Sequence, residues 1–310
     1  MDKVAKIFLA GHTGLVGSSI LRKLKENQYT NIIVSTHQQL DLRQQSLVED
    51  FFREKKPQYV ILSAALVGGI RANITNPTEF LYDNLMIQNN VIYSSYKNNV
   101  EKLLFVACGC AYPTNAPQPM KEEYLLTGLP EPTNEGFALS KLTGIKLCEK
   151  IFDQYKRCFI SCIPANTYGP NDHFDQFKSH VIPGLIKKVF LAKRQNLKQV
   201  DVWGTGKAIR EFIYVDDLAE AILLLMNKYH KREVINIGSG QEITIKDLVF
   251  LIKEIVGYKG KIIFDKTKPD GMKRRFLNSS KLQDLGFTAK TDLKNGLKKT
   301  YDYFLQEIQS

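Results

Sequence analysis

Short apolar runs alternate with longer segments of helical periodicity along the first half of the chain. The runs at residues 6–10, 32–35, 59–63, 103–107 and 159–164 are typical of strands that are buried on both faces. Between them, apolar residues recur at helical spacing, most clearly after residue 15 and over residues 73–99. This alternation predicts an α/β fold in which helices cover both faces of a doubly wound parallel sheet, the Rossmann arrangement.

Beyond residue 170 the alternation is less regular. Strand-like runs at 200–203, 209–213 and 234–238 are mixed with helical segments over 180–190 and after residues 216 and 244. We therefore predict a dinucleotide-binding Rossmann domain over residues 1–170, with returning segments near 205–240. Residues 171–310 are expected to form mainly a smaller, interleaved substrate-binding region.

A Gly-x-x-Gly-x-x-Gly turn joins the first predicted strand to the first predicted helix. Its glycines let the backbone approach a pyrophosphate, which would lie at the partly positive N-terminus of the helix. A tight strand–helix turn without a ligand is the alternative interpretation. The turn predicts cofactor contacts from Gly11, Thr13, Gly14, Leu15, Val16 and Gly17.

The second predicted strand ends without the acidic residue that would bind an adenosine 2′-OH and repel a 2′-phosphate. Ser35 and His37 stand there instead and allow either cofactor, so we expect NADP or NAD. Asp41 and Leu42 fit a contact on the adenine side. The remaining cofactor candidates are small or polar residues on later segments: Ala64, Ala65, Asn84, Lys141, Pro164, Asn166 and Thr167.

The composition is that of a soluble globular protein, with 44% hydrophobic and 24% charged residues. No apolar run approaches the ~18 residues that a membrane span needs, and the N-terminus has no signal-peptide pattern. The 5 cysteines are odd in number and are not spaced as a disulfide framework or a zinc site. We therefore expect a cytoplasmic protein that has no metal and no membrane contact.

The formal charge of +11 has three interpretations. Basic clusters such as residues 273–275 are most often solvated surface, but they can also bind a nucleotide diphosphate or a nucleic acid. No nucleic-acid-binding module is recognisable, so we expect no nucleic-acid partner.

Taken together, these motifs resemble the extended short-chain dehydrogenase/reductases that act on nucleotide sugars, and among them the GDP-L-fucose synthase type. The resemblance covers essentially the whole chain, and some stretches are more specific than the glycine turn. These are Val67-Gly68-Gly69-Ile70, residues 103–113, residues 131–135, Ser179-His180-Val181-Ile182-Pro183, Val202-Trp203-Gly204, Arg210-Glu211-Phe212 and residues 268–271.

The resemblance implies an enzyme with two kinds of chemistry on a 4-keto sugar. Proton exchange at C3 and C5 would be carried out by Cys110 and His180, whose thiol and imidazole are groups that can take up and release protons. Reduction at C4 with NADPH would use a Ser-Tyr-Lys triad. The serine aligns with Gly109 and the tyrosine with Phe137, so only Lys141 remains.

Three interpretations follow from these replacements. The first is a C3/C5 epimerase in which C4 reduction is impaired, absent, or assisted by another acid such as Cys108 or Tyr112. The second is a complete epimerase–reductase in which Phe137 is an engineered change. The third is a protein that binds nucleotide sugars without catalysis.

The resemblance also implies the substrate and its contacts. It predicts a GDP-linked 4-keto-6-deoxy sugar, hexose or heptose, used in making a capsule or glycan precursor. A homodimer through the helices at 73–99 and 135–155 is implied as well. The predicted substrate contacts are Cys108, Asn166, His180, Val181, Lys188, Trp203, Arg210, Asp270 and Arg274.

Overall fold

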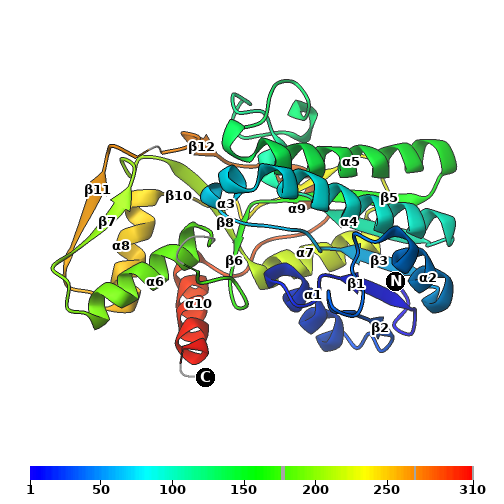
Figure 1. Cartoon of the computed structure of the whole chain (residues 1–310), viewed down its shortest axis with the longest axis horizontal. Coiled ribbons are helices and arrows are strands. Elements are labelled where there is room, and N and C mark those ends of the chain that lie inside the picture. The colour runs from blue at the N-terminus through cyan, green and yellow to red at the C-terminus, as the bar shows by residue number, and fades with distance from the viewer. Residues whose placement is uncertain (176–178, 269, 309–310) are drawn as a thin grey trace.

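The computed structural model describes residues 1–175, 179–268 and 270–308. A six-stranded, wholly parallel sheet with the order β2-β1-β3-β4-β5-β9 forms its centre (Figure 1). The predicted doubly wound parallel sheet is therefore confirmed. The strands are β1 (Ile7–Ala10), β2 (Ile32–Ile33), β3 (Tyr59–Leu62), β4 (Lys102–Val106), β5 (Cys158–Pro164) and β9 (Ile235–Ile237).

Helices cover both faces of this sheet because each strand is almost entirely apolar and has to be buried on both sides. On one face α4 packs against α5, and on the other α1 packs against α7. The helices of this part are α1 (Leu15–Glu26), α2 (Gln45–Lys55), α3 (Ile70–Thr75), α4 (Pro77–Lys97), α5 (Glu135–Tyr155) and α7 (Val215–Lys228).

The single helix expected over residues 73–99 is divided into α3 and α4. Pro77 is the cause, because a proline disfavours helical backbone at the residue before it. Asn76 accordingly has φ −128° and ψ 52°, and Pro77 takes the first position of α4. A proline is well tolerated at that position, where the missing N–H would have no helical partner.

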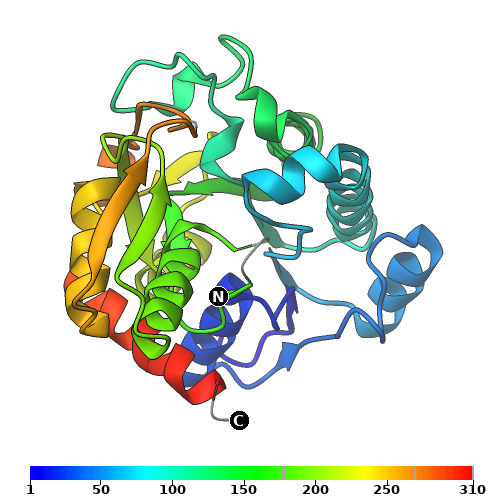
Figure 2. The same cartoon turned by 60° about the vertical axis from the view of Figure 1, so that its left-hand side comes forward.

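A smaller region lies beside the sheet, on the left of Figure 1. Figure 2 brings it forward and shows its helices gathered beside short strands. Its strands are β6 (Asn166–Tyr168), β7 (Gln199–Trp203), β8 (Ile209–Tyr214), β10 (Glu242–Thr244), β11 (Lys261–Asp265) and β12 (Arg274–Arg275). Its helices are α6 (Val181–Arg194), α8 (Ile245–Val256) and α10 (Leu293–Glu307), whereas α9 (Ser280–Gln283) packs against β9 of the large sheet.

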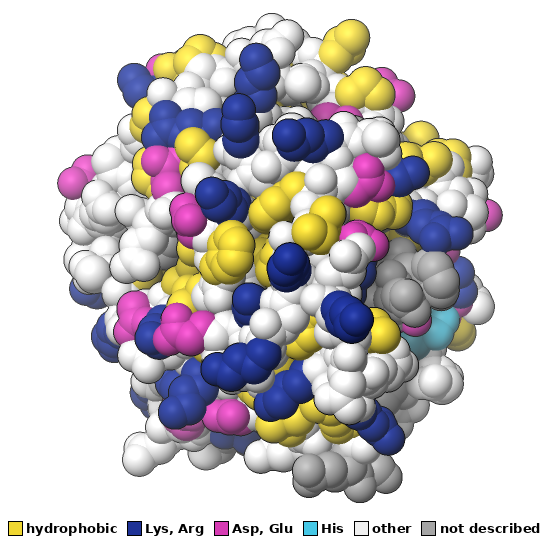
Figure 3. Space-filling model, turned by 90° about the vertical axis from the view of Figure 1, so that its left-hand side faces the viewer, with side chains coloured by type: hydrophobic (Ala, Val, Ile, Leu, Met, Phe, Trp, Pro, Cys, Tyr) yellow, Lys and Arg dark blue, Asp and Glu magenta, His cyan; other side chains and the backbone are white. Residues whose placement is uncertain are grey.

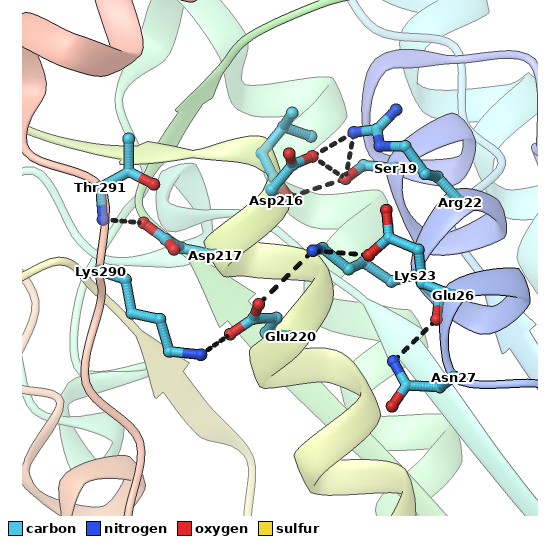
Figure 4. Close-up of polar contacts among 11 residues, drawn as sticks. Ser19, Arg22, Lys23, Glu26, Asn27, Asp216, Asp217, Glu220, Lys290 and Thr291 are labelled. Carbon is cyan, nitrogen blue, oxygen red and sulfur yellow. Dashed lines mark hydrogen bonds and ion pairs between the residues drawn. The ribbon is translucent and has the colours of Figure 1, made fainter.

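Segments from the two halves of the sequence are joined by polar contacts between α1 and α7 (Figure 4). Arg22 forms an ion pair with Asp216. The carboxylate of Glu220 lies 3.5 Å from Nζ of Lys23 and 2.8 Å from Nζ of Lys290. Thus α7, which lies late in the sequence, is fixed to the first helix of the chain. Each region has its own buried cluster of apolar side chains.

Three single-turn helices, η1 (Gly109–Ala111), η2 (Glu122–Tyr124) and η3 (Pro132–Asn134), lie in the loops after β4. Within the described residues, no helix is long and apolar enough to cross a membrane. Thr244 caps the N-terminus of α8, because its hydroxyl oxygen accepts a hydrogen bond from the Asp247 N–H at 3.0 Å.

Candidate active site

The glycine turn after β1 is held tightly against the loop after β3. Gly11 has φ +90°, and a Cβ at this position would lie 2.6 Å from the backbone nitrogen of Ala64. A Cβ at Gly17 would overlap the carbonyl group of Gly11. Both positions therefore require glycine, and the sheet order reverses at β1, where open α/β sheets have their ligand crevice.

The residues of this turn fit a dinucleotide. Gly14 precedes α1 and offers no side-chain cap, so the first N–H groups of the helix are free to bind an anion. The buried Nδ1 of His12, in the middle of the turn, has no hydrogen-bond partner among the described residues. A Cβ at Gly14 would meet only the Gly11 carbonyl oxygen, at 3.7 Å, which leaves room for a pyrophosphate.

Asn84, expected at the cofactor, acts on the backbone instead. Its Oδ1 accepts the Leu66 N–H at 2.9 Å, and its Nδ2 donates to the Leu66 carbonyl at 3.0 Å. The side chain is buried, and both ends of its amide are engaged. Asn84 thus shapes the loop that contains Ala64 and Ala65 rather than facing a ligand.

A Cys-Gly-Cys turn follows β4 at the carboxyl edge of the sheet. The structure joins Cys108 to Cys110 by a disulfide, with their Cα atoms 5.4 Å apart. This corrects the expectation of unbonded cysteines, which was based on sequence spacing alone. A Cβ at Gly109 would lie 3.7 Å from the Pro164 carbonyl oxygen and 3.8 Å from Cδ of Arg275, so this turn adjoins β5 and β12.

Lys141 is buried on α5 and reaches back to the end of β4. Its ammonium lies 3.3 Å from the Val106 carbonyl oxygen and 5.6 Å from the centre of the Phe137 ring. Burial lowers the pKa of Lys141 from 10.5 to about 7. Phe137 is half-buried and meets the Phe80 ring edge to face, with ring centres 6.0 Å apart.

Tyr112, considered above as an alternative acid, is not placed for that role. Its hydroxyl lies 2.8 Å from Oδ1 of Asn236, and the side chain is buried. Burial raises the pKa of Tyr112 well above its usual value. The phenol is therefore a structural hydrogen-bond donor under the Cys-Gly-Cys turn.

His180 immediately precedes α6, and its side chain is exposed at the protein surface. The pKa of His180 is lowered, first by the surrounding protein atoms and then by the charge of nearby His173. Residues 176–178, which lead into this position, lie outside the described residues.

The arginine that points inward is Arg275, not the predicted Arg274. Neighbouring residues of a strand face opposite sides, and β12 presents Arg274 to Glu242, which it binds through two nitrogens at 2.6 Å. Among the described residues Arg275 has no carboxylate at ion-pair distance; its Nε is unpartnered, and burial lowers its pKa to about 10.

Arg275 is in register with Arg210 on the parallel strand β8. Arg210 donates to the carbonyl oxygens of Ile209 at 2.8 Å and Met272 at 2.6 Å, which fixes its guanidinium beside β12. Two neighbouring guanidinium groups, one of them without a counter-ion, are a suitable site for a polyanion. The sequence offered no signal that could choose between Arg274 and Arg275, since that choice depends on strand register.

Other predicted substrate contacts lie along the smaller region. Trp203 is 60% exposed, and the Lys268 ammonium lies 5.8 Å from its ring centre. Asp270 accepts both the N–H and the hydroxyl of Thr205 at 2.7 Å, so it fixes the turn after Trp203. Asn166 donates to the Glu211 carbonyl at 2.8 Å.

The face formed by this region carries many basic side chains (Figure 3). Lys188 on α6 is exposed, as are Lys259, Lys261, Lys266 and Lys268 near β11. The positive electrostatic potential of these side chains attracts an anionic ligand toward the region. No cluster of three or more His, Cys, Asp or Glu residues suited to a metal ion occurs in the described part of the chain.

Comparison with known proteins agrees with this arrangement. Residues 7–238 match the NAD dependent epimerase/dehydratase family. The chain is 52% identical over 307 residues to GDP-L-fucose synthase 1 of Arabidopsis thaliana, covering 99% of this chain and 95% of that protein.

Two solved structures from Campylobacter jejuni are similar over nearly their whole length. A GDP-6-OMe-4-keto-L-xylo-heptose reductase superposes with a TM-score of 0.93 at 37% identity, over 99% of each chain. A GDP-D-glycero-L-gluco-heptose synthase, determined in the presence of NADPH, superposes with a TM-score of 0.91 at 37% identity, over 98% of this chain and 99% of that one.

Proposed function

The chain belongs to the NAD dependent epimerase/dehydratase family and to its GDP-L-fucose synthase type, and we propose that it is a C3/C5 epimerase of a GDP-linked 4-keto-6-deoxy sugar. Reduction at C4 is impaired or absent in this proposal. The relatives named above include both hexose-type and heptose-type enzymes, so the proposal covers both sugar lengths.

One observation carries the proposal: Lys141 is retained beside a Phe137 ring that has no hydroxyl group. A phenyl ring cannot donate a proton to the C4 oxygen, and a Gly109 hydrogen cannot replace a serine hydroxyl. A missing general acid costs about 10²–10⁴-fold in rate. Epimerisation does not need this donor, and both residues proposed for it are present.

The epimerisation is proton transfer next to a carbonyl. The thiolate of Cys110 takes a proton from C3 or C5, and the C–H electron pair moves toward C4 so that negative charge develops on the C4 oxygen. Protonated His180 returns a proton to the opposite face of that carbon, and the carbonyl reforms. Because a sulfur in a disulfide cannot accept a proton, this chemistry requires Cys108 and Cys110 as free thiols.

The chain would hold the cofactor by the glycine turn at the N-terminus of α1, with Lys141 near the nicotinamide ribose. When bound, a nicotinamide cofactor would supply the hydride for C4, the step that the missing hydroxyl groups impair in this proposal. Arg210 and Arg275 would hold the diphosphate, and the exposed face of Trp203 offers a stacking surface for the base.

The test is incubation of the thiol-reduced protein with GDP-4-keto-6-deoxymannose in D₂O, with and without NADPH or NADH. We expect deuterium at C3 or C5 by mass spectrometry and little loss of nicotinamide absorbance. Turnover of the nicotinamide at an ordinary enzyme rate of ~10 s⁻¹ would show a complete epimerase–reductase instead. Tight GDP binding without any exchange would show a non-catalytic binding protein.

Two variants separate the roles of the proposed acid and base. Cys110→Ser should abolish exchange at one carbon while GDP binding is retained, since a hydroxyl is a far weaker base than a thiolate. His180→Asn should leave exchange measurable but block inversion, because inversion needs a group on each face. Cys158→Ser, a half-buried cysteine at the opposite end of β5, is the control.

A further inference from the structure

The side chain of Arg275 lies against the turn that contains the proposed base. A Cβ at Gly109 would lie 3.8 Å from Cδ of Arg275, and Gly109 immediately precedes Cys110. The other contact of that Cβ within 4 Å, outside the turn itself, is the Pro164 carbonyl oxygen at 3.7 Å. The position that a side chain at Gly109 would take therefore borders directly on Arg275.

The nitrogen bonded to this Cδ, Nε of Arg275, is a buried donor. It has no hydrogen-bond partner among the described residues. The nearby sulfur of Met272 accepts from a different nitrogen, Nη2, at 3.2 Å. A polar group that is buried without a partner costs about 1–3 kcal/mol, so a group of this kind indicates a place where a ligand supplies the partner.

The positive charge of Arg275 is not neutralised by a neighbouring carboxylate. The carboxylate whose charge acts on it is Glu131, and the two form no ion pair within the described residues. Glu131 is engaged elsewhere, since its Oε2 accepts the N–H of Thr133 at 3.1 Å and the hydroxyl of the same residue. Arg210, in register on β8, adds a second positive charge. The electrostatic potential beside Gly109 is therefore positive.

A positive donor at this place fits the proposed epimerisation. When Cys110 takes a proton from C3 or C5, the C–H electron pair forms a carbon–carbon double bond to C4, and the carbonyl pair moves onto the C4 oxygen. The carbon that loses its proton is bonded to C4, so this oxygen lies near the Cys110 sulfur. At the two positions that the resemblance assigns to hydroxyl donors for the oxygen, Phe137 and Gly109 have none.

We propose that the Nε–H of Arg275 donates a hydrogen bond to the C4 oxygen and stabilises the negative charge that develops there during epimerisation. No proton leaves the guanidinium: the Cys110 thiolate accepts one from the carbon, and protonated His180 returns one to the opposite face. The outer nitrogens of Arg275 remain available to the diphosphate, because a guanidinium has N–H groups on three nitrogens. This inference rests on the function proposed above and adds a catalytic residue to it.

The test removes Nε while keeping the positive charge. In Arg275→Lys a methylene group takes the place of Nε, and the ammonium lies further along the side chain. With the thiol-reduced protein at saturating GDP-4-keto-6-deoxymannose in D₂O, we expect deuterium exchange about 10²–10³-fold slower than in the parent, the cost of removing one donor to an oxyanion. The dissociation constant for GDP should change less than about tenfold. Equal exchange rates in Arg275→Lys and the parent would overturn the proposal.

Gly109→Ser tests whether the two positions serve the same oxygen. Added to Arg275→Lys, the serine hydroxyl should restore exchange by about tenfold or more, because it replaces the lost donor. Slow exchange that the serine does not restore would show that Arg275 only supports the turn. Arg274→Lys is the matched control, the same substitution on the opposite face of β12, and should exchange like the parent because Arg274 is paired with Glu242 at 2.6 Å.

A binding measurement separates this inference from the function on which it rests. Calorimetry with GDP-mannose and its 4-deoxy analogue measures the contribution of the C4 oxygen without any exchange. The parent should bind GDP-mannose several-fold more tightly than the analogue, and Arg275→Lys should lose this preference. A parent that has the preference but exchanges no deuterium contradicts the proposed function alone. Equal binding of both compounds by the parent, or a preference that Arg275→Lys retains, contradicts the role of Arg275.

Discussion

The ammonium nitrogen of Lys141 lies 5.6 Å from the centre of the Phe137 ring, one helical turn away along α5. In a tyrosine–lysine pair the cation would lower the pKa of the phenol, but a phenyl ring has no proton for it to influence. The ammonium instead donates to the Val106 carbonyl at 3.3 Å. Where the resemblance implies a tyrosine–lysine pair, the chain thus has the cation beside a ring that has no hydroxyl group.

Restoring both hydroxyls should restore reduction. We expect Phe137→Tyr combined with Gly109→Ser to raise nicotinamide-dependent turnover by about 10²-fold or more, the scale of a general acid. The serine fits without strain, because a Cβ at Gly109 meets its nearest atoms at 3.7 and 3.8 Å. The measurement is loss of nicotinamide absorbance with a 4-keto sugar substrate.

Phe250→Tyr is the control for this gain. Phe250 is 42% exposed on α8, so a phenol there adds the same group outside the proposed site and should leave turnover unchanged. If the double variant reduces the 4-keto sugar no faster than the parent protein does, the absent hydroxyl groups do not limit C4 reduction.

The Cys108–Cys110 bond should make exchange depend on thiol reduction. In the parent, deuterium exchange at C3 or C5 should appear only after treatment with a dithiol, which frees the Cys110 sulfur. Cys108→Ser removes the bonding partner, so its exchange should be the same with and without reductant. Mass spectrometry of the intact protein verifies the oxidation state.

The half-buried Cys158 again provides the control, since Cys158→Ser should keep the reductant dependence of the parent. Full exchange by a parent sample that is verified as disulfide-bonded would show that Cys110 is not the base.

Strand orientation separates the two arginines of β12. Arg275→Met should weaken GDP binding by about 10–100-fold, the range of a lost hydrogen bond to a charged group, ~1.5–3 kcal/mol. Arg274→Met should change it less than about twofold, because Arg274 is already paired with Glu242 at the surface. Calorimetry with GDP measures both, and the reverse order of effects would restore the sequence-based choice of Arg274.

The sequence predicted the large sheet well because each of its strands is a short apolar run between turn signals. The glycine turn could also be placed, since its position between a strand and a helix is local in sequence. Arg275 could not be found in this way. Which arginine of β12 is paired depends on the position of Glu242, and the contact between Arg274 and Glu242 depends on the register of the strands.

The division of α3 from α4 shows the same limit at the level of an element. Apolar spacing alone extends the predicted helix through Asn76, while the local effect of Pro77 ends it there. The disulfide was missed for a related reason, because spacing rules for cysteines describe frameworks of several bridges and not one turn after a strand.

Buried Lys141 should make stability depend on pH in a defined direction. Its pKa is about 7 in the folded protein and near 10.5 when unfolded. Between these values the unfolded chain binds the extra proton, so the free energy of unfolding rises as pH increases through this window. Below pH 7 the folded protein must bury a charged ammonium, and the destabilising effect of Lys141 is then fully present.

Lys141→Met should therefore raise the free energy of unfolding by about 2–4 kcal/mol at acidic pH, with the gain shrinking as pH approaches 10.5. Urea unfolding of the cofactor-free protein across this range measures it. Burial also lowers the pKa of Lys102, to about 8. Lys102 is present in both proteins, so its contribution cancels from the difference between their free energies of unfolding. Lys150→Met changes an exposed position of the same helix, and its free energy of unfolding should show no such dependence on pH. If Lys141→Met stabilises the protein equally at every pH, the effect comes from packing rather than from charge.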